Sequence, residues 1–220
     1  GLRYLHVTPN ETIGGVEFHS APDTGGVPLV ADMSSNILSR PIDVRDYDLI
    51  YAGAQKNIAI SGIALVIVHE SLVGTAHPMT PSVMNFAAQL KSDSMLNTPP
   101  TFAWYLAGLV FDWLEAGGGL EAMGRANAAK AKALYGAIDG SNFYTNPVAK
   151  PDRSSMNVPF TLADAGLDNE FLQRAEAAGL AGLKGHRAVG GMRASIYNAT
   201  PLAGVESLVE FMQEFERTHG

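Results

Sequence analysis

Residues 47–57 read YDLIYAGAQKN, and this stretch decides the fold. Its first half, Tyr47–Ala52, is a short and almost continuous apolar run, which predicts a buried strand. Its second half is a turn made of glycine, alanine and amide side chains around one lysine, Lys56. Ligands bind to open α/β sheets where the strands end, so this turn is the first candidate for a functional site.

Three more apolar runs on either side of this stretch have the same character. They are Arg3–Val7 (RYLHV), Val27–Asp32 (VPLVAD) and Gly62–His69 (GIALVIVH). The first runs into TPNETIGG, which reads as a polar turn, and polar residues cluster just after the runs. Together the runs predict a mostly parallel sheet with helices on its faces, as in α/β proteins.

The second half of the chain has a different pattern. A helix is predicted from Pro99 to about Ala116, with Trp104 and Trp113 in the core, and Gly117–Gly119 separates it from a second helix that ends near Ile138. Further on, the pattern predicts strand, helix, two strands and helix, at Ser155–Leu162, Asp168–Gly179, Ala181–His186, Met192–Tyr197 and Pro201–His219. We therefore expect a larger α/β unit over residues 1–116 and a smaller α+β unit over residues 117–220.

Composition excludes several classes of function. The net charge of −7 argues against nucleic acid as a partner, because phosphate binding needs a basic surface. The absence of cysteine excludes disulfides and thiolate chemistry and is compatible with a reducing cytoplasm. The longest apolar run, Ile63–Val68, is far too short to span a membrane. The histidines show no metal-binding spacing, so we predict no metal site.

Lys56 and Asp32 are the two residues whose positions suggest chemistry. A lysine forms a Schiff base when its amine loses a proton, and a desolvated site at a strand end favours that loss. A carboxylate such as Asp32 can balance a buried cation, for example the pyridine nitrogen of pyridoxal phosphate (PLP). The alternatives are a surface lysine and a turn or capping aspartate. Tyr51 and Lys56 are one residue too far apart for the Tyr-x-x-x-Lys pair of short-chain dehydrogenases, so we reject that reading.

Five segments in order resemble the phosphoserine aminotransferase family of fold-type I PLP enzymes. They are HVTPNETIGG, VADMSSNILSRPIDV, LIYAGAQKN, LNTPPTFAWYL and GHRAVGGMRASIYNA. The resemblance runs from about Tyr4 to the last residues. It implies that the chain is the C-terminal portion of such an enzyme, with part of the PLP-binding large domain followed by the small domain.

The resemblance also assigns roles to individual residues. Lys56 matches the lysine that binds PLP and moves the proton, and Asp32 matches the partner of the pyridine nitrogen. The other cofactor-binding residues would be Thr12 near the phenolic oxygen, Gln55 at the phosphate, and Asn97 and Thr98 at the phosphate of the neighbouring subunit. The substrate-binding residues would be His186 and Arg187 for the phosphate and Arg193 for the carboxylate.

The activity implied is transfer of an amino group between glutamate and 3-phosphohydroxypyruvate in serine biosynthesis, by a cytoplasmic homodimer that shares its sites across the interface. Whether the enzyme also serves pyridoxine synthesis, as some relatives do, stays open. The family's glycine-rich loop, ring-stacking tryptophan and His–Arg pair are not found, and Ala59 and Ile60 replace its usual glycine and proline. The alternatives are a clipped or non-catalytic fragment, a separate N-terminal piece that stays bound, and another fold-type I enzyme. Among the last, the absence of cysteine disfavours a desulfurase, and ILSRPIDV disfavours a plain aspartate aminotransferase.

Overall fold

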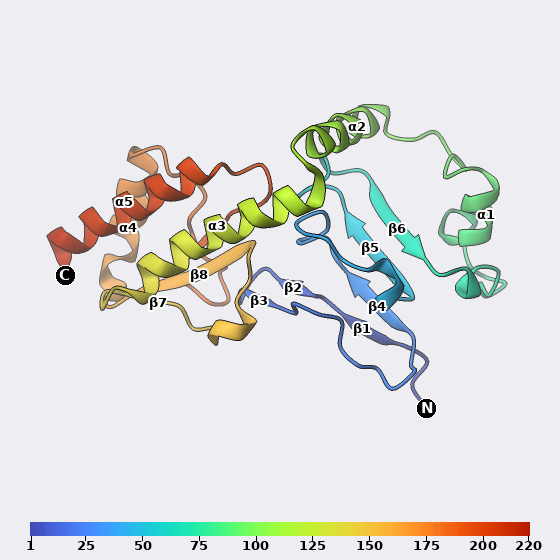
Figure 1. Cartoon of the computed structure of the whole chain (residues 1–220), viewed down its shortest axis with the longest axis horizontal. Helices are drawn as coiled ribbons and strands as arrows, with labels where there is room; N and C mark the ends of the chain where they lie inside the picture. Colours follow the sequence, from blue (N-terminus) through green and yellow to red (C-terminus); the bar gives the residue numbers. More distant parts are fainter.

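The first sheet carries the lysine turn, and its strands follow the apolar runs of the sequence. The computed structural model describes residues 1–220. The strands β1 (Leu5–Val7), β4 (Leu29–Asp32), β5 (Leu49–Gly53) and β6 (Ala64–Val68) lie side by side in the order β1-β4-β5-β6 (Figure 1). The pairs β1–β4 and β4–β5 are parallel, so their carboxyl ends share one edge of the sheet.

The fourth strand departs from the parallel arrangement. β6 pairs antiparallel with β5, with Gly53 opposite Ala64 and Leu49 opposite Val68. The connection between them is only the turn 54–63, and a parallel pair needs a crossover of a dozen residues or more. The turn that carries Lys56 is therefore also a hairpin connection.

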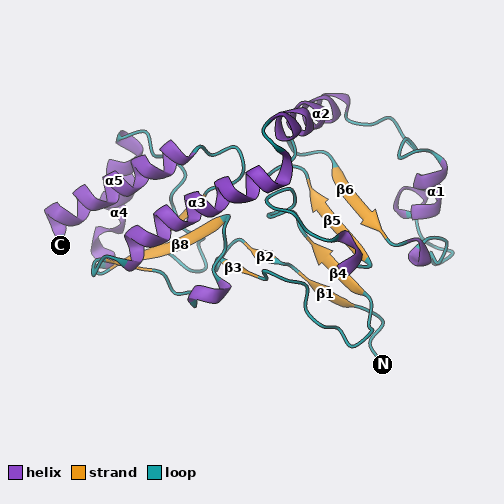
Figure 2. Ribbon diagram, viewed as in Figure 1, coloured by secondary structure: helices purple, strands orange, loops and turns teal.

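The segment TPNETIGG is not only a turn, as the sequence suggested. It contains β2 (Asn10–Glu11), which pairs antiparallel with β3 (Val16–Glu17). The tip of this hairpin reaches the second half of the chain, where the N–H of Ser154 donates to the C=O of Gly15 at 2.9 Å. Figure 2 shows the hairpin between the two sheets.

The helices in the middle of the chain are α1 (Phe86–Lys91), α2 (Thr101–Ala116) and α3 (Gly119–Asp139). The sequence predicted α2 and α3 but not α1, which is too short to show a periodicity. Gly118 has a φ of 97° between α2 and α3, a backbone conformation that glycine adopts without strain. Short 3-10 helices lie at Val44–Asp46, Glu70–Leu72, Ser82–Met84, Lys150–Asp152 and Ala165–Leu167.

The second sheet is antiparallel and contains β7 (Tyr144–Thr145), β8 (Asn157–Leu162) and β9 (Met192–Ser195) in that order. α4 (Asp168–Ala177) and α5 (Leu202–His219) complete this part. The strand predicted at Ala181–His186 is wrong. Only an isolated bridge, Lys184 to Met192, forms there, because the segment bends at Gly182, whose φ is 78°.

The buried residues form two separate hydrophobic clusters. The smaller lies around the first sheet and includes Ile50, Ala52 and, from α2, Ala107. The larger joins α3, the second sheet, α4 and α5, and Phe171 and Phe215 lie at its centre, edge to face. These separate cores support the division of the chain into two domains near Gly117, and this division stays a prediction.

One face of α2 is uncovered, contrary to the expectation that its tryptophans lie in the core. Trp104 is 39% exposed and Trp113 is 48% exposed. Part of this face borders an apolar groove of about 740 Å³ between α2, β6 and α1. The periodicity of the sequence identified an apolar helix face correctly, but no residue of this chain covers it. No helix has the length and apolar character needed to cross a membrane.

Candidate active site

Asp32 and the lysine turn meet at the carboxyl edge of the first sheet. Asp32 ends β4 opposite Tyr51 of β5, and residues 54–57 follow directly after β5. The Asp32 carboxylate is held in place because its Oδ1 accepts from the Ser34 N–H at 2.9 Å and from the Ser34 hydroxyl at 2.6 Å. The same hydroxyl accepts from the Gly53 N–H at 2.9 Å, so Ser34 links the ends of the two strands.

Lys56 is half-buried and forms no salt bridge. Burial lowers the pKa of its amine, and the nearby Arg193 guanidinium lowers it further. The carboxylates of Asp32 and Glu11 act in the opposite direction. The amine therefore lies among one cation from β9 and two anions from β4 and β2. Because the lowering effects are larger, it loses its proton more easily than an ordinary lysine.

Arg193 comes from the second sheet but reaches the β2–β3 hairpin. Its Nη1 donates to the C=O of Thr12 at 3.0 Å. Its Nε is buried and has no hydrogen-bond partner. A guanidinium with a free, buried donor beside an amine is a suitable place for an anionic group such as a carboxylate. The structure thus brings Arg193, Thr12, Asp32 and Lys56 together.

Gln55 lies next to this group and is exposed. Its side chain folds back over Gly53, where an added Cβ would lie 2.7 Å from the Gln55 Oε1. Any side chain at position 53 would therefore displace Gln55.

His186 and Arg187 lie in the loop that leads into β9. His186 is half-buried, its Nδ1 accepts from the Ala188 N–H at 3.3 Å, and its C=O accepts from the N–H groups of Val189 and Gly190. Arg187 is exposed and has no ion pair. The bond from the Arg193 N–H to the C=O of Leu183 ties this loop to the strand of Arg193.

Asn97 and Thr98 are not part of this group. Both are exposed, and the Asn97 Nδ2 donates only to the C=O of Thr98 at 3.2 Å. They precede α2, whose cap is Pro100 and not Asn97. Asn97 lines the apolar groove together with Trp104 and with Ala54 and Ile58 of the lysine turn, but its side chain forms no hydrogen bond with Lys56 or Asp32.

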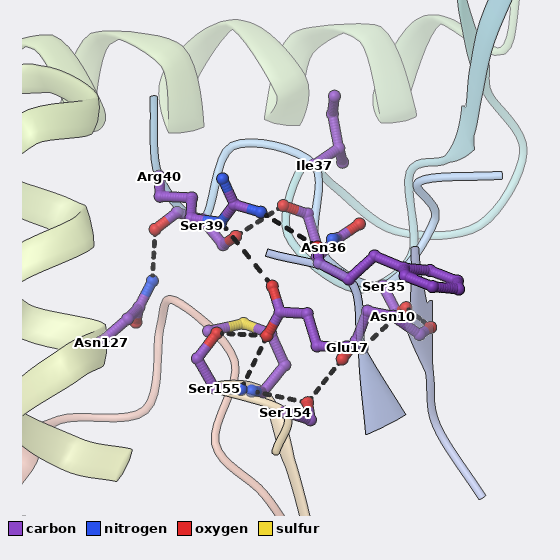
Figure 3. Close-up of polar contacts among 12 residues, drawn as sticks. Asn10, Glu17, Ser35, Asn36, Ile37, Ser39, Arg40, Asn127, Ser154 and Ser155 are labelled. Carbon is purple, nitrogen blue, oxygen red and sulfur yellow. Dashed lines mark hydrogen bonds and ion pairs between the residues drawn. The ribbon is translucent and has the colours of Figure 1, made fainter. Parts of the chain in front are cut away.

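A buried polar cluster below the site was missed by sequence reasoning (Figure 3). Asn10 Nδ2 donates to Ser35 Oγ and to Asn157 Oδ1, each at 2.9 Å. The Glu17 carboxylate, 2% exposed, accepts from the N–H and hydroxyl of Ser155 at 2.8 Å. These contacts fix the β2–β3 hairpin on β8 and so fix the backbone that binds Arg193. No sequence pattern signals them, since Ser35 is 25 positions from Asn10, and the partners on the β8 side are more than 130 positions away.

Comparisons with known proteins identify the family of this chain. The family described as Aminotransferase class-V matches residues 1–208. The chain belongs to the class-V aminotransferase family. Its relatives include the phosphoserine aminotransferases of Azotobacter vinelandii, 60% identical, and Pseudomonas syringae pv. syringae, 57% identical, each over 99% of the chain. The chain spans 60% of the length of these curated relatives.

Solved structures show the same fold as this class-V aminotransferase chain. The phosphoserine aminotransferase from Bacillus circulans subsp. alkalophilus matches 99% of the chain with a TM-score of 0.95 and 50% identity, and the chain covers 60% of it. The PLP-bound phosphoserine aminotransferase from Trichomonas vaginalis matches 96% with a TM-score of 0.91 and 42% identity, again with 60% covered. The expected fold class, part of a fold-type I aminotransferase, is confirmed.

Proposed function

We propose that the protein containing this chain is a phosphoserine aminotransferase, which moves an amino group from glutamate to 3-phosphohydroxypyruvate with PLP as cofactor. The observation that carries the proposal is the meeting of Lys56, Asp32 and Arg193 at the end of β5, where burial lowers the pKa of the Lys56 amine. The names of the relatives and of the matched structures support the same reaction.

The residues present fit PLP. The cofactor needs an amine that can lose its proton, and the lowered pKa of Lys56 meets that need. It also needs an anion at its pyridine nitrogen, and the Asp32 carboxylate is fixed by Ser34 at a neighbouring strand end. Lys56 would hold the aldehyde carbon, Asp32 the ring nitrogen, Thr12 the phenolic oxygen and Gln55 the phosphate. When bound, PLP supplies an electron sink for negative charge at the substrate α-carbon.

Lys56 then acts as the proton carrier. Its amine would take the proton from the substrate α-carbon as a general base and deliver it, as a general acid, to the cofactor carbon that receives the amino group. A lowered pKa keeps a larger fraction of the amine neutral near pH 7, which is the form that accepts the proton. Asp32 favours the protonated ring nitrogen throughout, because a nearby carboxylate stabilises that positive charge.

Recognition of the substrate would fall to two arginines and a histidine on and before β9. Arg193 would bind the α-carboxylate with its planar fork of donors, and its free, buried Nε supports this role. His186 and Arg187 would bind the phosphate of the keto acid. The exposed Arg187 has no competing ion pair, which leaves its guanidinium available.

We further propose a homodimer in which Asn97 and Thr98 serve the cofactor phosphate of the neighbouring subunit. Both residues are exposed, and the Asn97 side chain makes no contact with Lys56 or Asp32 of its own chain, which supports that arrangement. The reaction belongs to serine biosynthesis, and a part in pyridoxine biosynthesis is a further proposal. A cytoplasmic location is consistent with a chain that has no cysteine.

A second candidate is a non-catalytic fragment of the same enzyme. The chain spans 60% of its curated relatives, and its apolar groove and the outer face of α2 are uncovered. On this reading the 220 residues alone lack aminotransferase activity, and the activity belongs to a longer protein or to an assembly with a separate N-terminal piece. An assay of the 220-residue chain beside the longer protein separates the two candidates.

A keto-acid panel tests the substrate assignment. With glutamate as donor and PLP present, we expect kcat/KM for 3-phosphohydroxypyruvate to exceed that for hydroxypyruvate by at least about 100-fold, since a site built for a polar group discriminates strongly against its absence. Arg187→Ala should reduce this preference, while Arg217→Ala, an exposed arginine on α5, should leave it unchanged. Equal turnover of the two keto acids would rule out the phosphoserine assignment.

A further inference from the structure

Asn57, the residue after Lys56, connects three segments of the chain. It is 5% exposed. Its Oδ1 accepts from the backbone N–H of Asn198 at 3.1 Å, and its Nδ2 donates to the C=O of Ile37 at 3.0 Å. Ile37 belongs to the loop that follows Asp32, and Asn198 belongs to the segment that follows Arg193. The amide group of Asn57 thus contacts the backbone that follows Asp32 and the backbone that follows Arg193.

Asn198 adds further contacts to the junction, by which we mean the place where residues 37–39, Asn57 and Asn198 meet. Its Nδ2 donates to the C=O of Leu38 at 2.9 Å, and its Oδ1 accepts from Asn127 Nδ2 at 2.9 Å. Asn127, on α3, also donates to the C=O of Ser39 at 2.8 Å, a contact drawn in Figure 3. Three buried asparagines therefore bind the carbonyls of the consecutive residues 37–39.

The backbone at this junction is strained and needs these contacts. Leu38 has a φ of 60°, a conformation that is unfavourable for a residue with a side chain and persists only where its surroundings enforce it. The segment after β9 is held as firmly, because Lys130 Nζ donates to the C=O groups of Ile196, Tyr197 and Thr200 at 2.8–3.0 Å. Both sides of the Asn57–Asn198 contact are thus fixed in position.

We infer that Asn57 is a positioning residue of the aminotransferase reaction: it holds the Lys56 turn in register with the Asp32 loop and the Arg193 segment. The inference rests on the proposed function. The amide is suited to this task because it supplies one acceptor and one donor at the same point. Removal of the side chain leaves the Asn198 N–H and the Ile37 C=O buried without partners, and the three segments lose their common contact.

Asn57→Ala in the complete PLP-loaded protein is the first test. Because small displacements of aligned groups lower rates steeply, we expect kcat/KM for glutamate to fall by about 10- to 100-fold while the bound PLP per subunit stays unchanged. Asn198→Ala keeps its backbone bond to Asn57 and should give a smaller loss in the same direction. Asn142→Ala, an exposed asparagine without a side-chain hydrogen bond, should leave kcat/KM unchanged.

A second readout needs neither PLP nor turnover. In the cofactor-free protein, the pH dependence of Lys56 acylation, followed by peptide mass, reports how easily the amine loses its proton. Burial lowers the pKa of the Lys56 amine. Of the charged groups around it, Arg193 lowers this pKa further, while Asp32 and Glu11 raise it. Looser packing of the turn exposes the Lys56 amine to water and so weakens the burial that is the main cause of its lowered pKa, and the acylation midpoint for Asn57→Ala should shift to higher pH.

A core variant separates positioning from general loss of stability. Ile138→Ala removes a side chain on α3 that is 1% exposed in the larger cluster, and it should destabilise the protein while leaving the Lys56 midpoint unchanged. An unchanged midpoint and kcat/KM in Asn57→Ala, or an equal shift in Ile138→Ala, would overturn the inference. If Asn57→Ala fails to fold, Asn198→Ala decides by the same criteria. A wild-type protein without aminotransferase activity would refute the proposed function, and the acylation midpoints would still decide the role of Asn57.

Discussion

At the scale of single residues, the positions that carry chemistry and those that support them differ in how well the sequence reveals them. The positions of Lys56 and Asp32 at the edge of the sheet could be predicted because Asp32 ends one apolar run and Lys56 follows shortly after another, while their roles stay predictions. Asn57, Asn198 and Lys130 could not, because each binds backbone carbonyls of residues distant in the sequence. Such contacts depend on the tertiary fold and have no periodicity.

Lys130 gives a prediction about stability and pH. It is 2% exposed, and burial lowers the pKa of its amine from 10.5 to about 8, while its three carbonyl acceptors favour the charged form. Between pH 8 and 10.5 the unfolded chain binds the proton more tightly than the folded one, so stability rises with pH. We expect the free energy of unfolding to increase by about 2 kcal/mol from pH 7.5 to 9.5 through this group.

Urea unfolding at a series of pH values measures this dependence. In Lys130→Met the rise over that window should shrink by the Lys130 contribution, and in Lys132→Met, an exposed neighbour on α3, it should persist in full. The raised pKa values of Tyr135 and Tyr144 affect stability only above pH 10, where unfolded tyrosines ionise. An identical pH dependence in wild type and Lys130→Met would show that Lys130 titrates normally.

At the scale of elements, the sequence predicted the long helices and most strands and missed the pieces that join the two sheets. α2, α3 and α5 follow from apolar periodicity. The sequence predicts only a polar turn where the hairpin β2–β3 lies, because the two strands of the hairpin are only two residues long. An apolar run does not indicate whether its strand pairs parallel or antiparallel, so the sequence does not predict the direction of β6. The short turn 54–63 forces β6 to pair antiparallel with β5.

Gly15 tests the importance of the hairpin. Its φ is 75°, and an added Cβ would overlap the ring of Pro159 and lie 2.8 Å from the C=O of Asn157. Gly15→Ala should therefore push the hairpin away from β8 and destabilise the protein by about 2–4 kcal/mol in urea unfolding. Gly25→Ala is the matched control, with a φ of 60° and open space around it, and it should cost only about 1 kcal/mol. Equal effects of the two changes would mean that backbone strain alone, not the close approach, determines the loss.

At the scale of the whole molecule, the chain leaves an apolar face of α2 uncovered. The tryptophans of α2 were expected in a core and are exposed, because periodicity identifies an apolar face without identifying what covers it. Asn97 lines the groove beside this face, and its side chain forms no hydrogen bond with Lys56. A homodimer that shares its sites accounts for both observations.

Mixed dimers test this sharing. Lys56→Ala subunits lack the amine, and Asn97→Asp subunits place a negative charge where the neighbour's cofactor phosphate would bind, so each homodimer should be nearly inactive. If the subunits exchange at random, half of the dimers are mixed and each has one intact site, so about a quarter of wild-type activity should return. Mixing that restores no activity would show that Asn97 serves the site of its own subunit.

The most direct test of the central claim is a map of where PLP attaches. The protein is incubated with PLP, reduced with borohydride and digested, and the masses of its peptides are measured by mass spectrometry. The account predicts a stable adduct on the peptide that contains Lys56, and its loss in Lys56→Arg. An adduct on another lysine such as Lys130, or an equal yield in Lys56→Arg, would contradict the assignment of this turn as the active site.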